Sequence, residues 1–465
     1  LKPGEKIALT AFFWCPMGIT LGNSNNRQLS MYILMIAVFV IGYAAIAFEH
    51  SLKIDKAAAA LITGVLCWAI YVLGGGAGDH GGEGELLHHL SEISSILFFL
   101  LGAMTIVEVV DAHEGFSVIT DRIKTNKIVT LMWIICWLTF FFSAILDNLT
   151  TSIVMISLLK KLVDDKPTRW IFAGMVIIAA NAGGAFSPIG DVTTTMLWIG
   201  GQVSTGSIIT HVFFPSIIAL LVPLLIISTQ LKGEVTRPVA QGNDRLKLPK
   251  SEQTTVFTIG VLGLLFVPVF KTVTHLPPFM GMMLSLGVLW IITDLIHKHK
   301  PSDVKQQIGV LGVLRKIDTP SVLFFLGILL AVAGLQSAGH LTDMATLLDN
   351  NLGTDTQGGI YAVASVIGLL SSIVDNVPLV AASMGMYPLA EGAGYFSQDG
   401  LFWQFLAYCA GTGGSVLIIG SAAGVAVMGL ERIPFGWYLK RISLLALIGY
   451  VSGIGAYIFQ NWLIG

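Results

Sequence analysis

The chain has 465 residues, of which 54% are hydrophobic and 12% are charged, and its formal net charge is -2. Because a soluble domain carries roughly 25% charged residues, this composition excludes a soluble protein and predicts an all-α, polytopic membrane protein. The four cysteines show no paired spacing, and the sequence has neither a Walker A loop nor a GxSxG elbow. These features give no support to an enzyme, a resident cofactor or a nucleic-acid partner.

The first 30 residues admit two interpretations. Lys2 and Lys6 precede an apolar run from Ile7 to Leu21, and a polar segment from Asn23 to Gln28 follows. A basic start and a short apolar run are typical of a signal-peptide-like leader. A first transmembrane helix is the alternative interpretation, and both stay open.

The rest of the chain divides into apolar segments of about the length that crosses a bilayer. The predicted spans are residues 31–48, 57–74, 93–110, 170–199, 207–230, 254–270, 277–296, 320–336, 401–427 and 442–463. Two other apolar stretches, 128–159 and 358–390, are much longer than one span. Each carries an Asp-Asn pair near its centre.

Lys and Arg residues predict the orientation, because cytoplasmic loops are enriched in them. The basic loops contain Lys53 and Lys56; Arg122, Lys124 and Lys127; Lys160, Lys161, Lys166 and Arg169; the segments 232–250 and 298–316; and Arg432, Lys440 and Arg441. The loops between them are acidic, with Asp79, Glu83 and Glu85; Asp343, Asp349 and Asp355; and Glu391 and Asp399. The acidic loops are therefore predicted to be external.

This charge pattern decides the topology of the two long stretches. Basic loops flank 128–159 at both ends, and acidic loops flank 358–390 at both ends. Each stretch must therefore return to the side from which it entered, as a re-entrant helical hairpin. Their tips read Ser143-Ala-Ile-Leu-Asp147-Asn148-Leu-Thr150 and Ser371-Ser-Ile-Val-Asp375-Asn376-Val-Pro378.

Hairpins that enter from opposite faces are typical of an inverted-topology repeat. The flanking spans agree, because 93–110, 170–199 and 207–230 correspond in order to 320–336, 401–427 and 442–463. We therefore predict a first half over 31–230, a cytoplasmic linker over 231–253 and a second half over 254–465.

The span that follows each hairpin is itself interrupted. The first, 170–199, contains Asn181, Gly183-Gly184, Pro188 and Asp191-Val-Thr193-Thr194; the second, 401–427, contains Thr412, Gly413-Gly414 and Ser415. Paired glycines and a proline are expected to unwind a helix. Unwound backbone at membrane depth must line a cavity or be covered by protein. Two tips and two broken helices would then form an oxygen-rich chamber suited to a small hard cation such as Na⁺.

Each feature also has an interpretation without function. Asn148 and Asn376 could cap the returning helices, and Asp147 and Asp375 could do the same, although burying a charge is not needed for a cap. The glycine pairs could simply allow close helix packing. Asp191, with Thr193 and Thr194, could lie in water at the outer end of its span.

Taken together, the Ser-x3-Asp-Asn tips, the Asn-Ala-Gly-Gly-Ala-Phe-Ser-Pro-Ile-Gly-Asp run and the Gly-Thr-Gly-Gly-Ser run resemble the NhaD-type sodium/proton antiporters of the ion transporter superfamily. The resemblance covers the chain from about residue 30. It implies a homodimer in a bacterial inner membrane that exchanges cytoplasmic Na⁺ or Li⁺ for external H⁺. The functional positions that it implies are Ser143, Asp147, Asn148, Asn181, Asp191, Thr193, Thr194, Ser371, Asp375, Asn376 and Ser415; Thr150 and Thr412 join them as oxygen donors from the same motifs.

In the expected mechanism, Asp147 and Asp375 hold H⁺ or Na⁺ in turn, and the hairpins and broken helices move together against the other helices, as in an elevator. The alternative within the same superfamily is a sodium-coupled symporter of a dicarboxylate or a similar anion. Asp at both tips argues against it, because a carboxylate repels an anion.

Overall fold

The computed structural model of the chain describes residues 24–47, 49–74, 82–120, 122–238 and 248–464. Most of these residues are helical, and two isolated β-bridges are found among them. The predicted leader over residues 1–30 lies mostly outside the described residues, because the description begins at Ser24.

Among the described residues, eight helices are long and apolar enough to cross a membrane, which confirms a polytopic membrane protein. They are α3 (Lys56–Leu73), α4 (Glu83–Ala112), α6 (Ile128–Leu146), α10 (Thr205–Gln230), α11 (Lys250–Thr274), α12 (Pro278–Ile296), α15 (Thr319–Ser337) and α22 (Ser443–Ile464).

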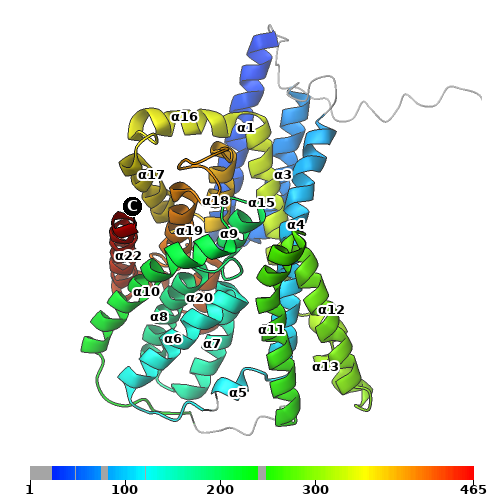
Figure 1. The fold of residues 1–465 in the computed structure, drawn as a ribbon, viewed down its shortest axis with the longest axis vertical. Helices are drawn as coiled ribbons and strands as arrows, with labels where there is room; N and C mark the ends of the chain where they lie inside the picture. The colour runs from blue at the N-terminus through cyan, green and yellow to red at the C-terminus, as the bar shows by residue number, and fades with distance from the viewer. Residues whose placement is uncertain (1–23, 48, 75–81, 121, 239–247, 465) are drawn as a thin grey trace, which may run out of the picture.

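Six helices pack with one another on one side of the molecule, to the right in Figure 1. In this six-helix group, α1 (Ser24–Ala47) packs on α3 and α3 on α15, while α11 packs on α12 and α12 on α4. A further contact between α4 and α15 joins the two sets of three.

The remaining long helices form a second group, which we call the hairpin group. Besides α6, α10 and α22 it contains α7 (Asn148–Leu162), α8 (Lys166–Ala185), α9 (Val192–Ile199), α17 (Gln357–Leu370), α18 (Asn376–Met386), α19 (Leu401–Gly413) and α20 (Ala422–Glu431). Short connecting helices complete the described fold: α2 (Glu49–Leu52), α5 (Ser117–Thr120), α13 (Ser302–Ile308), α14 (Val310–Leu314), α16 (His340–Leu352) and α21 (Phe435–Arg441).

Both long apolar stretches are divided in the middle, as the sequence predicts. Asp147 separates α6 from α7, and residues 371–375 separate α17 from α18. The helices α6 and α7 lie in the lower half of the molecule and α17 and α18 in the upper half (Figure 1). The helices of the first stretch continue to Leu162, and those of the second run from Gln357 to Met386.

The predicted interruptions of the two following spans also exist, but three of the four glycines, Gly183, Gly184 and Gly413, lie within helices. Helix α8 continues through Gly183 and Gly184 and stops at Ala185, and α19 continues to Gly413, with Gly414 as its right-handed C-cap. A Cβ atom at Gly183 would collide with the carbonyl oxygen of Phe140 in α6. One at Gly413 would collide with the carbonyl oxygen of Gly368 in α17.

The prediction of unwinding is therefore wrong for Gly183, Gly184 and Gly413, whereas Gly414 begins the second interruption, as predicted. Their lack of a side chain lets each broken helix press against the first helix of its hairpin. The interruptions lie at residues 186–191 and 414–421, and Pro188 lies inside the first.

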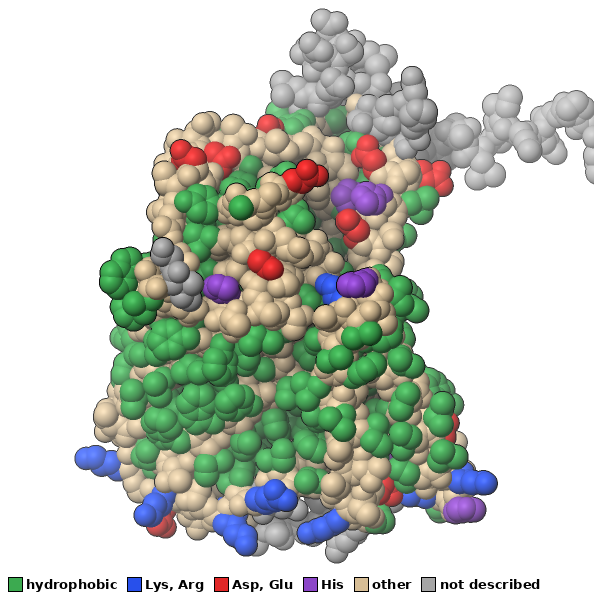
Figure 2. Space-filling view, in the orientation of Figure 1, with side chains coloured by type: hydrophobic (Ala, Val, Ile, Leu, Met, Phe, Trp, Pro, Cys, Tyr) green, Lys and Arg blue, Asp and Glu red, His purple; other side chains and the backbone are tan. Residues whose placement is uncertain are grey.

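Charged side chains are distributed unevenly over the surface. Lys and Arg gather at the lower end in Figure 2, Asp and Glu lie mostly in the upper part, and a broad hydrophobic band lies between. The segment after α10 is fixed at the basic end, since the Val235 amide donates to the Asn126 carbonyl (2.8 Å). Because α11 begins at Lys250, the predicted linker over 231–253 ends inside that helix.

Candidate functional site

Asp191 lies in the interruption between α8 and α9, where it is the N-cap of α9. One carboxylate oxygen, Oδ1, accepts hydrogen bonds from the amide and the hydroxyl of Thr193, both at 2.9 Å. Only 2% of Asp191 is exposed. The expectation that this aspartate could lie in water at the end of its span is therefore wrong.

The other carboxylate oxygen of Asp191 is where the two hairpins meet. Asn148, the first residue of α7, donates from Nδ2 to Oδ2 at 2.7 Å. Asn376, the first residue of α18, donates from Nδ2 to the same Oδ2 at 3.4 Å. The two asparagines therefore do not cap their own helices, as one interpretation of the sequence had it, but turn to a shared acceptor.

A second layer of polar groups completes this arrangement. Asn181 accepts from Asn148 at 3.1 Å and donates to the hydroxyls of Ser415 (2.9 Å) and Ser421 (3.0 Å). These two serines belong to the interruption between α19 and α20, so both broken helices contribute. We call the set of Asn148, Asn181, Asp191, Asn376, Ser415 and Ser421 the polar junction.

The polar junction is buried, because each of its members is at most 5% exposed. It offers one carboxylate together with amide and hydroxyl oxygens. Hard cations prefer such oxygen ligands, and the cluster has the composition of a site for a small cation or a proton. A buried carboxylate held only by neutral groups is costly, and it is most often found where it has a functional role.

Asp147 and Asp375 lie beside the polar junction and cap the returning helices. The Asp147 carboxylate accepts from the amide (2.9 Å) and the hydroxyl (2.7 Å) of Thr150. The Asp375 carboxylate accepts from the amide of Val377 at 3.1 Å and lies 4.0 Å from the ammonium group of Lys56 in α3. Each of these aspartates therefore caps a helix, as one interpretation of the sequence predicts, and each lies at a tip next to the polar junction.

Two of the predicted serines, Ser143 and Ser371, donate hydrogen bonds to backbone carbonyl oxygens and not to the polar junction. Ser143 donates to the carbonyl oxygen of Ala180 in α8 at 2.5 Å, and Ser371 donates to that of Ala410 in α19 at 3.2 Å. Each serine therefore ties the first helix of a hairpin to the broken helix that follows. The same tie occurs in both halves of the chain.

Two predicted threonines are also engaged with backbone rather than with the polar junction. Thr194 donates to the carbonyl oxygen of Ser187 at 2.8 Å, inside the first interruption. Thr412 donates to the carbonyl oxygen of Tyr408, one turn earlier in α19, at 2.6 Å.

Two residues of this region, Ser421 and Lys56, are not among the functional positions predicted from the sequence. Ser421 follows Gly420 as Asp191 follows Gly190, and each is the N-cap of the second half of its broken helix. That parallel could have identified Ser421. No local pattern marks Lys56, because its partner lies in a distant part of the chain.

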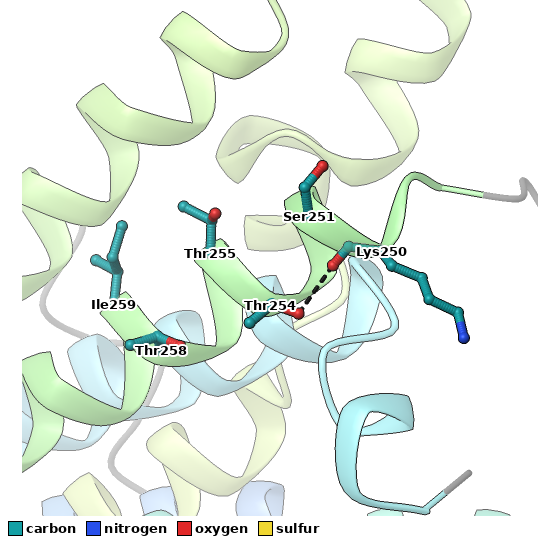
Figure 3. A pocket seen from close by; sticks show the side chains of 6 residues that line it. All are labelled: Lys250, Ser251, Thr254, Thr255, Thr258 and Ile259. Atoms are coloured by element: carbon teal, nitrogen blue, oxygen red, sulfur yellow. Dashed lines mark hydrogen bonds between the residues drawn. The ribbon is translucent and has the colours of Figure 1, made fainter.

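A pocket elsewhere on the surface does not compete with this site. It is an open hollow along the first turns of α11, and its lining comes from that helix alone: Lys250, Ser251, Thr254, Thr255, Thr258 and Ile259 (Figure 3). The Thr254 hydroxyl is already used in a bond to the Lys250 carbonyl at 2.9 Å.

Comparisons with known proteins agree with a transport site. The sequence profile of the citrate transporter family matches residues 31–405. Sodium/proton antiporter 1 of Arabidopsis thaliana is 49% identical over 428 residues, which cover 92% of this chain and 72% of that protein. Sodium/proton antiporter 2 of the same plant is 46% identical over 91% of this chain and 98% of that protein. The Na(+)/H(+) antiporter NhaD of Alkalimonas amylolytica is 30% identical, covering 92% and 90%.

Proposed function

The chain belongs to the citrate transporter family and, within it, to the NhaD-type sodium/proton antiporters, and from this premise we propose that it exchanges Na⁺ or Li⁺ for H⁺ at the polar junction. The family and its relatives identify a membrane transporter rather than an enzyme. The finer points, which are the residues that carry the ions and the motion that moves them, form the rest of the proposal.

The observation that carries the proposal is the shared acceptor at Asp191. Asn148 and Asn376 come from hairpins in the two halves of the chain, yet both donate to the same carboxylate oxygen. A cation bound there would contact both hairpin tips and both broken helices at once. Asp191 is accordingly the central ion-binding carboxylate of this proposal, with Asp147 and Asp375 supplying negative charge from either side.

Exchange follows from competition for one carboxylate. An ionised carboxylate away from water is unfavourable unless a cation or a proton neutralises it. Asp191 can be neutralised by Na⁺ or by H⁺, and binding of one removes the need for the other. Entry of a proton from one side therefore releases Na⁺, and the two fluxes are coupled without a further energy source.

Repeated contacts support an inverted repeat as the basis of alternating access. Helix α6 packs on α8 as α17 packs on α19, and α3 packs on α15 as α12 packs on α4. The serine ties and the N-caps at Asp191 and Ser421 recur in the same order. In the proposed motion, the hairpin group slides against the six-helix group and presents the polar junction to one side at a time.

The family name makes anion transport the second candidate. A citrate carrier would need positive or neutral groups facing its carboxylates, usually helix N-termini. Here the N-terminus of α9 is already capped by the Asp191 carboxylate, and α7 and α18 are capped by Asp147 and Asp375. These three carboxylates would repel citrate, so cation exchange is favoured.

Reconstitution into vesicles tests the two candidates together. We expect Na⁺ or Li⁺ to dissipate a preformed pH gradient, whereas K⁺ and citrate have no effect. Sodium-dependent uptake of labelled citrate without a Na⁺-driven change of pH would contradict the proposal. The homodimer and the bacterial inner membrane stay predictions; for the membrane, the relatives include both plant and bacterial proteins.

A further inference from the structure

Three side chains outside the polar junction meet at the ends of three helices of the six-helix group. His113 follows the last residue of α4, His297 follows the last residue of α12, and Glu252 is in the first turn of α11. All three are buried, at 0%, 2% and 7% exposure. The basic residues Lys298 and Lys300 follow directly, so the cluster belongs to the predicted cytoplasmic end.

The ligand atoms of these residues face one another. His113 Nε2 lies 2.9 Å from His297 Nε2 and 3.9 Å from Glu252 Oε1, and His297 Nε2 lies 3.3 Å from the same oxygen. A point equidistant from the three atoms is about 2 Å from each, which is close to the bond length of Zn²⁺ to imidazole nitrogen and carboxylate oxygen.

The tautomer of His113 also suits a metal ligand. Its Nδ1–H donates to the carbonyl oxygen of Val109 at 2.6 Å, so Nε2 carries a lone pair and points at the other two groups. Metal-binding histidines are usually fixed in this way by a bond from the second ring nitrogen to a carbonyl or carboxylate.

A cation already neutralises Glu252 in this arrangement. The Lys300 ammonium group donates to Glu252 Oε1, and the Lys300 side chain is 20% exposed, so its end can move into water. The cluster thus carries one negative charge balanced by one mobile positive charge. Asp294, one turn before His297 in α12, adds a further negative charge nearby.

We propose that His113, Glu252 and His297 bind a transition-metal ion of the zinc class, which takes the place of the Lys300 ammonium group. Two imidazoles and one carboxylate form a ligand set common for Zn²⁺. Na⁺ prefers oxygen ligands, so this site is chemically distinct from the polar junction. A bound ion would join α4, α11 and α12 at one end and hold this part of the six-helix group rigid.

The test uses the full-length protein, purified without a polyhistidine tag and freed of metal by a chelator. Zn²⁺ is titrated against a chromogenic zinc indicator, and Co²⁺ is followed by its visible absorption. We expect one Zn²⁺ per chain, and we expect binding to weaken by at least roughly 10-fold in His113→Ala, His297→Ala and the isosteric Glu252→Gln. Less than one Zn²⁺ per wild-type chain would overturn the proposal.

Two further variants separate a metal site from a simple hydrogen-bonded network. His299→Ala removes an exposed histidine two residues from His297 and should leave binding unchanged. Lys300→Met removes the competing ammonium group and should tighten Zn²⁺ binding several-fold. Unchanged or weaker binding in Lys300→Met would show that the lysine does not compete with a metal. Equal binding in His297→Ala and His299→Ala would show that the ion lies elsewhere.

Discussion

The two hairpin tips share a sequence pattern but not an environment. At the first tip, Asp147 has a φ of +79°, in the region that favours glycine, and both of its oxygens are bound by Thr150. At the second tip, Asp375 has a φ of −51° and lies near Lys56, a residue of the other helix group.

One position of the pattern explains much of this difference. The third residue after the aspartate is Thr150 in the first hairpin and Pro378 in the second. Thr150 offers an amide and a hydroxyl, whereas proline has neither. The Asp375 carboxylate therefore takes its hydrogen bond from Val377, one residue earlier, and is left near the Lys56 ammonium group.

The hairpins differ in packing as well. Helices α6 and α7 pack along each other as well as on α8, whereas α18 lies against α15 of the six-helix group. The first pair of helices thus makes only small contacts with α4 and α11, whereas α18 packs more extensively on a helix against which it is proposed to move. What the two tips retain in common is the asparagine that reaches Asp191, which points to the asparagines and Asp191 as the shared machinery.

The largest effect is expected when the acceptor that both tips share, the Asp191 carboxylate, is removed. In Asp191→Asn, the side chain can still cap α9 through its oxygen, so folding should be nearly kept; complete loss of a cap costs only about 1 kcal/mol. Asparagine cannot release a proton or neutralise Na⁺, so Na⁺-driven proton movement in vesicles should fall to background.

Asp318→Asn provides the matched control, because Asp318 is an exposed N-cap of α15 in the six-helix group. It should retain full exchange. Robust exchange in Asp191→Asn would show that the ions bind elsewhere.

The next largest effects concern the aspartates at which the tips differ. We expect Asp147→Asn and Asp375→Asn each to weaken Na⁺-driven exchange while expression persists, and the double variant to abolish it. The loss should be larger for Asp147→Asn, because Lys56 already offsets part of the charge of Asp375. The measurement is the rate of pH change on addition of Na⁺ between pH 7 and pH 9. Wild-type-like exchange in the double variant would exclude both aspartates from the ion path.

Adding a methyl group at the equivalent glycine should lower the stability of the protein by a similar amount in each half of the chain. Gly183→Ala and Gly413→Ala each place a Cβ atom against a backbone carbonyl of the neighbouring hairpin helix. Overpacking of this kind costs about 1–3 kcal/mol, so both variants should unfold at lower temperature in detergent. Gly429→Ala in α20 is the control, since a Cβ atom there meets nothing within 4 Å. Equal unfolding temperatures in all three variants would mean that the contacts at Gly183 and Gly413 relax freely.

The helices and their interruptions could be predicted from the sequence, because span length and charge bias are local properties. In the stretch 128–159, the predicted start of the first helix at Ile128 and the predicted interruption at Asp147-Asn148 agree with the structure. The unwinding at Gly183-Gly184 was predicted wrongly, because a glycine pair serves close packing as well as it serves a break. Close packing is distinguished from a break only by the carbonyl oxygens that lie next to these glycines, that of Phe140 beside Gly183 and that of Gly368 beside Gly413.

The site itself could be predicted only in part. Asp191 was recognised as a candidate, but its importance depends on the meeting of Asn148 with Asn376, which no spacing in the chain reveals. The same holds for the cluster of His113 and His297, which are 184 positions apart and belong to no local motif. Contacts between distant segments are set by packing, and packing was not visible in the pattern.

The smallest predicted effect is that of a variant that makes the second tip resemble the first. Pro378→Thr restores an amide and a hydroxyl at the position that Thr150 occupies, so the Asp375 carboxylate should turn toward its own helix and away from Lys56. The pair of Lys56 and Asp375 is partly exposed, with side-chain exposures of 22% and 15%, and is worth about 1 kcal/mol or less. A double-mutant cycle on thermal unfolding measures this coupling directly, with Lys56→Met as the second variant. Lys56→Met should reduce stability in the wild type and have almost no effect in the Pro378→Thr background. A cost of Lys56→Met that is the same in both backgrounds would show that the proline is not the reason why the two tips differ.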